Sequence, residues 1–244
     1  MNGPLSDKGK RTALASLIGI GFYLIPQIIY VISAAILANS SGSINADEYV
    51  MSNTALGYMQ FIVSIPIVCY GIFAFRDDFK KGVKSLKEAK TWGIIFGAFI
   101  LCLMLTFGVG IIYQMFGITG SSDNQSTVEA MLLSDAAIPM AIAVVVLAPI
   151  GEELIFRKMI FGVCEDSLGL KPIVPILIST IVFAFIHVIS GDSLIFIFQY
   201  IPLALMMVLA YYYSERNIVV SIGVHALNNL FSLIMLYLSI WLNI

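Results

Sequence analysis

The stretch Pro149-Ile-Gly-Glu152-Glu153-Leu-Ile-Phe-Arg157-Lys158 places two adjacent carboxylates at the end of an uncharged run, Ile138 to Ile150. An ionisable side chain in membrane hydrocarbon costs roughly 2.5–3.5 kcal/mol on insertion scales, so it indicates a functional site. The only two histidines of the chain, His187 and His225, also lie inside apolar runs. These polar side chains in apolar surroundings are therefore the candidates for chemistry.

The composition is that of a polytopic membrane protein. The 244 residues are 59% hydrophobic and 11% charged, whereas soluble domains are about 45–50% apolar and about 25% charged. A transmembrane helix needs about 20 mostly apolar residues. We therefore predict an all-α polytopic transmembrane bundle of about seven spans. The approximate runs are Ala13–Ala38, Ala55–Phe75, Trp92–Gly117, Ile138–Phe156, Ile173–Ile189, Leu194–Tyr213 and Ile218–Leu242.

The basic residues lie on one side of the predicted bundle. All 13 Lys and Arg residues either precede the first run or lie between runs two and three, four and five, or six and seven. The other loops, Asn39–Thr54, Ile118–Ala137 and Gly191–Ser193, contain none, and we interpret them as solvated connectors. Cytoplasmic loops are enriched in Lys and Arg. We therefore predict a multi-pass protein of the cell membrane with a cytoplasmic N-terminus and a retained first span.

The basic loop over residues 76–90 has helical periodicity. Phe79, Val83 and Leu86 recur among the five lysines of the stretch Lys80–Lys90. This pattern predicts an amphipathic helix on an anionic inner leaflet. A solvated positive-inside loop is the alternative.

The two carboxylates have different predicted tasks. On a helix, Glu153 and Arg157 lie one turn apart and can form an ion pair. Glu152 lies about 100° further round the helix. We therefore predict that Glu153 is structural and that Glu152 is the working carboxylate. The alternative is that both carboxylates simply lie at the membrane face beside Arg157 and Lys158.

Three further side chains complete the candidate site. His187 lies one turn after Phe183 on the same helix face, and His225 shares a face with Asn229. An Asn at this position can orient the His ring or donate to an oxyanion, whereas interhelical hydrogen bonding, worth about 0.6 kcal/mol on average, is the structural alternative. A carboxylate, two imidazoles and an amide provide a general base, orienting groups and oxyanion donors. This set is suited to the attack of water on an amide.

Covalent catalysis is not indicated, because the sequence has no nucleophile elbow, Ser–Lys pair or Cys–His motif. It also has no HExxH zinc motif. Glu152, His187 and His225 could nevertheless hold Zn²⁺ with an open water position. The residues leave open whether water is activated by a metal or by Glu152 alone.

Three motifs lie in order along the last four predicted helices: Glu-Glu-x-x-x-Arg at 152–157, Phe-x-x-x-His at 183–187 and His-x-x-x-Asn at 225–229. This order resembles the CAAX-protease and bacteriocin-processing (CPBP, or Abi) family of intramembrane proteases, which is related to the type II CAAX prenyl endopeptidases. The resemblance covers approximately Ala137 to Leu242. It implies that Glu152 activates water, that His187 and His225 assist, and that Asn229 stabilises the oxyanion. It also implies a role in peptide-signal processing or bacteriocin self-immunity, in either a metallo- or a glutamate-type enzyme.

We therefore predict an intramembrane endopeptidase that acts on a membrane-bound peptide or protein within the lipid bilayer, with no nucleic-acid partner. Residues 1–130 are predicted to form N-terminal transmembrane helices, and residues 131–244 a catalytic helical domain. The last four helices are expected to enclose a cavity open to the cytoplasm. A proton-coupled transporter or channel is an alternative, because buried Glu and His also form proton relays. A non-catalytic membrane scaffold is a further alternative.

Overall fold

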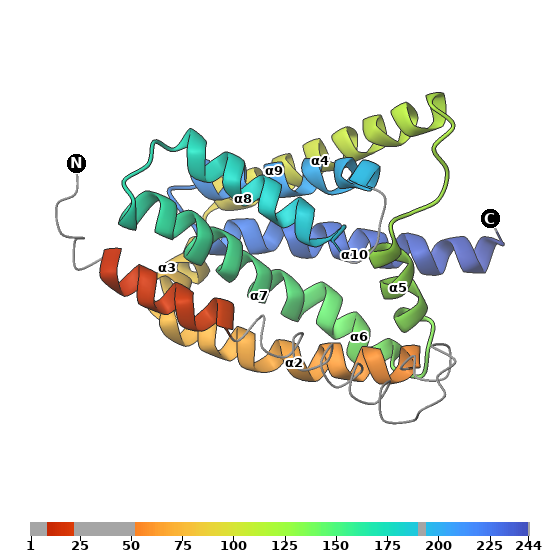
Figure 1. The fold of residues 1–244 in the computed structure, drawn as a ribbon, viewed down its shortest axis with the longest axis horizontal. Coiled ribbons are helices and arrows are strands. Elements are labelled where there is room, and N and C mark those ends of the chain that lie inside the picture. The colour runs from red at the N-terminus through yellow and green to blue at the C-terminus, as the bar shows by residue number, and fades with distance from the viewer. Residues whose placement is uncertain (1–8, 22–51, 190–193, 244) are drawn as a thin grey trace, which may run out of the picture.

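The computed structural model describes residues 9–21, 52–189 and 194–243, and this part of the chain is helical with no strand (Figure 1). The predicted all-α class is confirmed. The first helix covers residues 9–21 and lies beside α2, since the Tyr70 hydroxyl donates to the Ala15 carbonyl at 3.0 Å. The elements that follow are α2 (Asn53–Ala74), α3 (Arg76–Ser85), α4 (Ala89–Met115), α5 (Asp123–Leu132), α6 (Ala137–Ile142), α7 (Ala148–Glu153), α8 (Ile173–Ile186), α9 (Ile197–Tyr213) and α10 (Ile218–Leu242).

Five helical segments in the described part of the chain are long and apolar enough to cross a membrane. The run predicted at Ile173–Ile189 forms α8, whose 14 residues are fewer than a full span needs. The first run, Ala13–Ala38, and the loop Asn39–Thr54 fall largely outside the described residues. The predicted number of about seven spans is therefore not confirmed, although several apolar helices support a multi-pass membrane protein. The five segments are Asn53–Ala74, Ala89–Met115, Ala137–Ser167, Leu194–Tyr213 and Ile218–Leu242.

The fourth span does not end at Phe156, as the sequence predicts, but continues to Ser167. Arg157 is fully buried and Lys158 is 9% exposed, so neither is a loop residue. The helix continues because both cations are paired: Arg157 with Glu153, and Lys158 with Asp78 at 2.9 Å. Pairing removes much of the cost of burying a charge.

This longer helix brings Glu152 and His187 to a similar depth. Glu152 lies 15 residues before the end of its helix at Ser167, and His187 lies 15 residues after Pro172, the N-cap of α8. At 1.5 Å per residue, each lies roughly 22 Å from the same end of the bundle. A helix that ended at Phe156 would have left Glu152 near the membrane face instead.

The fourth span is also irregular. Three π-helical segments, Ala143–Leu147, Leu154–Ile160 and Val163–Ser167, interrupt its α-helical hydrogen bonding. Such segments are rare and frequently lie at functional sites. Here two of them flank α7, the short helix that carries Glu152 and Glu153.

The helices that carry the polar residues pack closely around this span. α9 contacts both α8 and α4, α10 contacts α4, α9 and α7, and α2 covers α5, α6 and α7 on the other side (Figure 1). A Cβ atom on Gly223 would lie 2.9 Å from Ile95 Cδ1. Glycine therefore permits the close approach of α10 to α4, two residues before His225.

The helix predicted in the basic loop is present as α3 and is shorter than the predicted stretch of 76–90. Phe79 and Leu86 pack against buried core residues, whereas Val83 is 46% exposed. The apolar face of α3 therefore contacts the bundle at least in part. Its contact with an anionic leaflet stays a prediction.

Candidate active site

The centre of the site is a buried ion pair. Arg157 Nε donates to Glu153 Oε2 at 2.8 Å, and neither side chain is exposed. The same guanidinium donates to the Ser179 hydroxyl and, at 3.4 Å, to the Ala204 carbonyl. Ser221 donates a further hydrogen bond to Glu153 Oε2. The predicted pair is present, and the alternative position of Glu153 at the membrane face is wrong.

Both histidine rings are oriented through Nδ1. His187 Nδ1 lies 2.7 Å from the Phe183 carbonyl oxygen, and His225 Nδ1 lies 3.3 Å from Glu153 Oε1. A carbonyl oxygen only accepts, and a carboxylate paired with Arg157 also accepts, so each Nδ1 carries the hydrogen. In a neutral imidazole the other nitrogen, Nε2, then presents a lone pair. In their neutral form both rings therefore present Nε2 to their surroundings as an acceptor.

These nitrogens face Glu152. Its Oε2 atom lies 3.9 Å from His187 Nε2 and 3.9 Å from His225 Nε2. This oxygen is buried and has no hydrogen-bond partner in the described part of the chain. Three acceptor atoms thus converge from α7, from the C-terminal end of α8 and from α10. The structure brings together the carboxylate and the two imidazoles that the sequence singled out.

Asn229 binds a backbone carbonyl that Pro149, which has no N–H, cannot bind. In the π-helical segment, the Ala148 N–H donates to the Ala143 carbonyl, five residues earlier. The next bond in this register would run from residue 149 to Val144, but proline has no N–H. Asn229 Nδ2 donates to the Val144 carbonyl instead, at 2.9 Å. Asn229 therefore joins α10 to the fourth span at the edge of the site.

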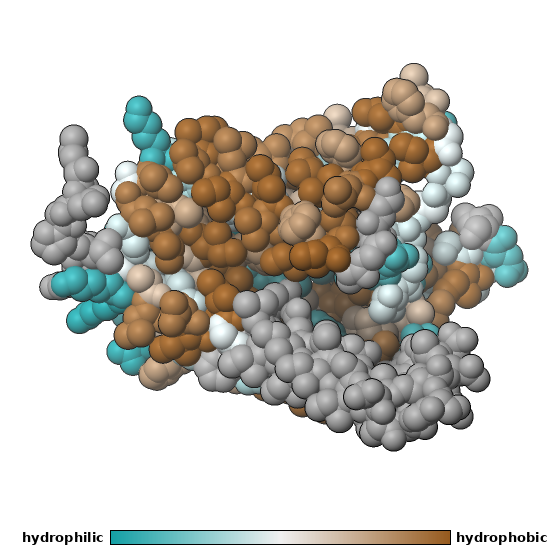
Figure 2. Space-filling view, viewed as in Figure 1, coloured by the Kyte–Doolittle hydropathy of each residue, from teal (hydrophilic) through white to brown (hydrophobic). Residues whose placement is uncertain are grey.

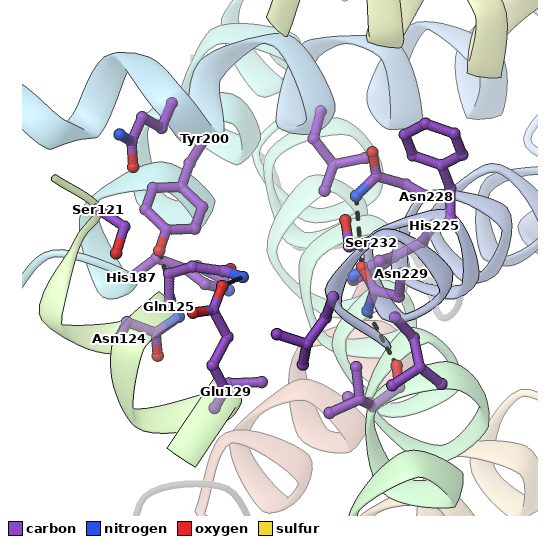
Figure 3. Close-up of a pocket in the computed structure, with 18 of the residues that line it drawn as sticks. Ser121, Asn124, Gln125, Glu129, His187, Tyr200, His225, Asn228, Asn229 and Ser232 are labelled. Atoms are coloured by element: carbon purple, nitrogen blue, oxygen red, sulfur yellow. Dashed lines mark hydrogen bonds between the residues drawn. The ribbon is translucent and has the colours of Figure 1, made fainter. Parts of the chain in front are cut away.

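A cavity of about 570 Å³ extends from these residues towards α5. Figure 3 shows two polar walls: α5 residues with Tyr200 and His187 on one side, and Asn228, Asn229 and Ser232 of α10 on the other. On the surface seen in Figure 2, polar residues gather around α5, whereas α8 is apolar.

This position corrects an expectation. From the sequence we expected a cavity open to the cytoplasm, the side to which the basic residues were assigned, whereas the cavity is lined by α5. Figure 1 shows α5 at the end of the bundle opposite α3, which carries lysines. The physical reason is that the space on the basic side of Glu152 is filled. The Glu153–Arg157 network occupies it, together with the fully buried rings of Phe156 and Phe183 at a centroid distance of 4.9 Å.

Several site residues were missed by the sequence analysis. Ser179 and Ser221 bind the ion pair, but single serines are common in membrane helices and give no signal. The ring of Tyr200 lies 4.8 Å from that of His187, and its hydroxyl bonds to Ser122. Asn228 donates to Asn229 Oδ1 at 3.4 Å and lines the cavity.

The loop Ile118–Ala137 is also more than a connector, because it contains α5, which forms one wall of the cavity. The sequence carries one signal for this helix. Ser122 is its N-cap and accepts a hydrogen bond from the Gln125 N–H, as expected of a serine before a helix.

The site contains side chains of the types that bind zinc, but the distances between their donor atoms are not those of a zinc site. Ligands about 2.1 Å from a shared tetrahedral ion lie about 3.4 Å apart, whereas Glu152 Oε2 lies 3.9 Å from each Nε2. Within residues 9–21, 52–189 and 194–243, no group of three or more His, Cys, Asp or Glu side chains is arranged to hold a metal ion. The residues in this arrangement do not fit a bound zinc, so we derive no step through one.

The fold and the site define a multi-pass helical membrane protein with a partly buried Glu–His–His cluster. Residues 134–231 match the family described as Type II CAAX prenyl endopeptidase Rce1-like. This segment contains all three motifs, and the match confirms the resemblance inferred from them.

Two relatives extend this result. The chain is 30% identical over 138 residues to the membrane-embedded CAAX protease MroQ of Staphylococcus aureus (strain USA300). This alignment covers 54% of this chain and 56% of that protein. It is also 30% identical over 163 residues to YdiL of Bacillus subtilis (strain 168), which is named as a membrane peptidase. This alignment covers 66% of this chain and 62% of that protein. The chain thus matches less than two thirds of the length of either relative. No solved structure matches it significantly.

Proposed function

We propose that the protein is an intramembrane endopeptidase in which Glu152 activates water for attack on a peptide bond. The observation that carries this proposal is the convergence of Glu152 Oε2 with the Nε2 atoms of His187 and His225, at 3.9 Å from each. With neutral rings all three atoms are acceptors, so a water molecule can donate one hydrogen to Glu152 and the other to one of the two imidazoles. The Rce1-like match and the two relatives named as a protease and a peptidase support the same class of reaction.

In this mechanism Glu152 is the general base. Its carboxylate takes a proton from water as the oxygen attacks the carbonyl carbon of the scissile bond. Glu152 then gives this proton to the leaving amine nitrogen, so that the C–N bond breaks and the products are a carboxylate and an amine. General acid–base catalysis of this kind contributes about 10²–10⁴-fold.

The histidines and amides have supporting roles. In their neutral form His187 and His225 accept the second hydrogen of the attacking water through Nε2 and so position this water beside Glu152. Glu153, ionised and held by Arg157, lies 3.3 Å from His225 Nδ1 and accepts its hydrogen, so that Nε2 faces the water as an acceptor. Asn229 positions α10 through Val144 and lines the cavity, where its amide is a candidate oxyanion donor.

The substrate class follows from where the site lies. Glu152 is 20% exposed at its side chain and faces a cavity inside the apolar bundle, so the scissile bond must enter the bilayer region. A membrane-associated peptide or protein meets this requirement. Peptide-signal processing and bacteriocin self-immunity are processes that use such substrates.

The proposal is tested with purified full-length protein in detergent. Wild-type protein is incubated with a mixture of synthetic apolar peptides, and new termini are identified by mass spectrometry. Cleavage that disappears in Glu152→Gln, while a thermal unfolding curve shows that the variant stays folded, supports the proposal. Cleavage that is equal in wild type and variant contradicts it.

A further inference from the structure

The Asp, Glu, Lys and Arg residues described in the lining of the cavity are all acidic. Among the described residues that line it, Glu152 and Glu129 are carboxylates and none is Lys or Arg. Glu152 belongs to the catalytic cluster described above. Glu129 has no place in that cluster and comes from α5, on the wall that the sequence analysis missed.

Glu129 is partly buried and is held in one position. Gln125, one turn earlier on α5, donates from Nε2 to Glu129 Oε1 at 2.8 Å. Figure 3 shows both side chains on the wall that faces Asn229 and His225 across the cavity. No cation within 4.0 Å balances the charge of Glu129 in the described part of the chain.

The wall that carries Glu129 is fixed in place. The Ser122 side chain at the start of α5 shares a hydrogen bond with the Tyr200 hydroxyl, and Asn124 Nδ2 donates to the same oxygen at 3.3 Å. The Tyr200 ring in turn lies 4.8 Å from the His187 ring. Glu129 therefore has a defined position relative to the catalytic cluster.

A carboxylate in a partly desolvated cavity attracts a cation more strongly than one in water. We propose that Glu129 determines specificity by binding a cationic group of the peptide substrate, either a Lys or Arg side chain or a free amino terminus. This inference rests on the proposed peptidase function and adds the substrate class that the site prefers.

The size of the cavity limits where this group lies. A sphere with the cavity's volume of about 570 Å³ would be about 10 Å across, and an extended peptide advances about 3.3 Å per residue. The cationic group is therefore expected within about three residues of the scissile bond.

The test uses purified full-length protein and synthetic apolar twelve-residue peptides in which Lys, Gln or Glu is placed at each position in turn. Cut sites and kcat/KM are measured by mass spectrometry. For wild type we expect peptides with Lys within about three residues of the cut to be cleaved about tenfold faster than the matched Gln peptides. In Glu129→Gln this ratio should fall to about one, while the rate on Gln peptides is retained. In Glu129→Lys the preference should change to Glu.

Asp123→Asn is the matched control, because it removes the same charge from α5 at an exposed residue outside the cavity lining. Its Lys preference should equal that of wild type. Cleavage by wild type without a Lys preference, or a preference that persists in Glu129→Gln, overturns this inference and leaves the peptidase proposal intact. If wild type cleaves none of the peptides while it is folded, both proposals fail.

Discussion

Arg157 Nε lies 2.8 Å from Glu153 Oε2, and both side chains are fully buried in the bundle. The second oxygen of Glu153 lies 3.3 Å from His225 Nδ1. The ion pair therefore connects the core of the fold to the ring that faces Glu152. Stability and activity are coupled at this point, and variants can separate them.

Removal of one partner of the pair is expected to destabilise the protein. Glu153→Gln and Arg157→Met should each lower the free energy of unfolding by about 3–5 kcal/mol, because each leaves a buried charge without its partner. The free energy of unfolding of the double variant should fall by clearly less than the sum of the two single-variant losses, because no unpaired charge remains. Thermal unfolding of the purified variants in detergent measures this difference. Additive losses would show that the two residues do not act as a pair.

Ser221 is expected to act on catalysis through Glu153. Ser221→Ala removes the hydrogen bond to Glu153 Oε2, and a hydrogen bond to a charged group contributes about 1.5–3 kcal/mol. We expect kcat to fall about tenfold with KM unchanged, because the carboxylate that orients His225 is less well held.

Ser239→Ala provides the control for Ser221→Ala, since it makes the same change on α10 outside the cavity lining. It should leave both kinetic constants at wild-type values. A Ser221→Ala variant with unchanged kcat, or with a change confined to KM, would remove Ser221 from the positioning network.

The side of the membrane on which the cavity opens is decided by labelling. The basic residues predict that Ser85 is cytoplasmic and that the α5 end, with exposed Ser126, lies outside. In a Cys69→Ala background, a cysteine at Ser126 should react with an impermeant thiol reagent added to intact cells, and one at Ser85 should not. The reverse pattern would place the cavity on the cytoplasmic side and overturn the predicted orientation.

Metal content tests how the water is activated. Because the 3.9 Å separations exceed those of a zinc site, we expect purified, chelator-free protein to hold well under one zinc per chain and to keep its activity in chelator. Near-stoichiometric zinc that disappears in His187→Ala and His225→Ala would contradict glutamate-only activation and would assign the water to a bound metal.

The sequence predicted those features that depend on local spacing. The helical spacing of Glu153 and Arg157 predicted their ion pair. It also placed His187 and Phe183 on one face, where their rings stack at a centroid distance of 4.5 Å. The apolar runs predicted helices, because a run of about 20 apolar residues has few other solutions in a membrane.

Features that depend on tertiary pairing could not be predicted from spacing. Arg157 and Lys158 were assigned to a loop because charge usually ends a span. Lys158 pairs with Asp78, and Arg157 also donates to Ser179 and to the Ala204 carbonyl, so partners from other parts of the chain help to bury both. The position of the cavity was not predicted, because it depends on how the ion pair and two phenylalanines fill the bundle on the basic side of Glu152. The wall formed by α5 lies in a short polar stretch whose composition resembles a solvated loop.

The most direct measurement is the cleavage rate of Glu152→Gln relative to wild type on the best peptide found, with thermal unfolding recorded for both proteins. The central claim is that Glu152 is the general base, so we predict a loss of about 10²–10⁴-fold in kcat with an unfolding temperature close to that of wild type. A folded Glu152→Gln variant that cleaves within tenfold of the wild-type rate would contradict the claim.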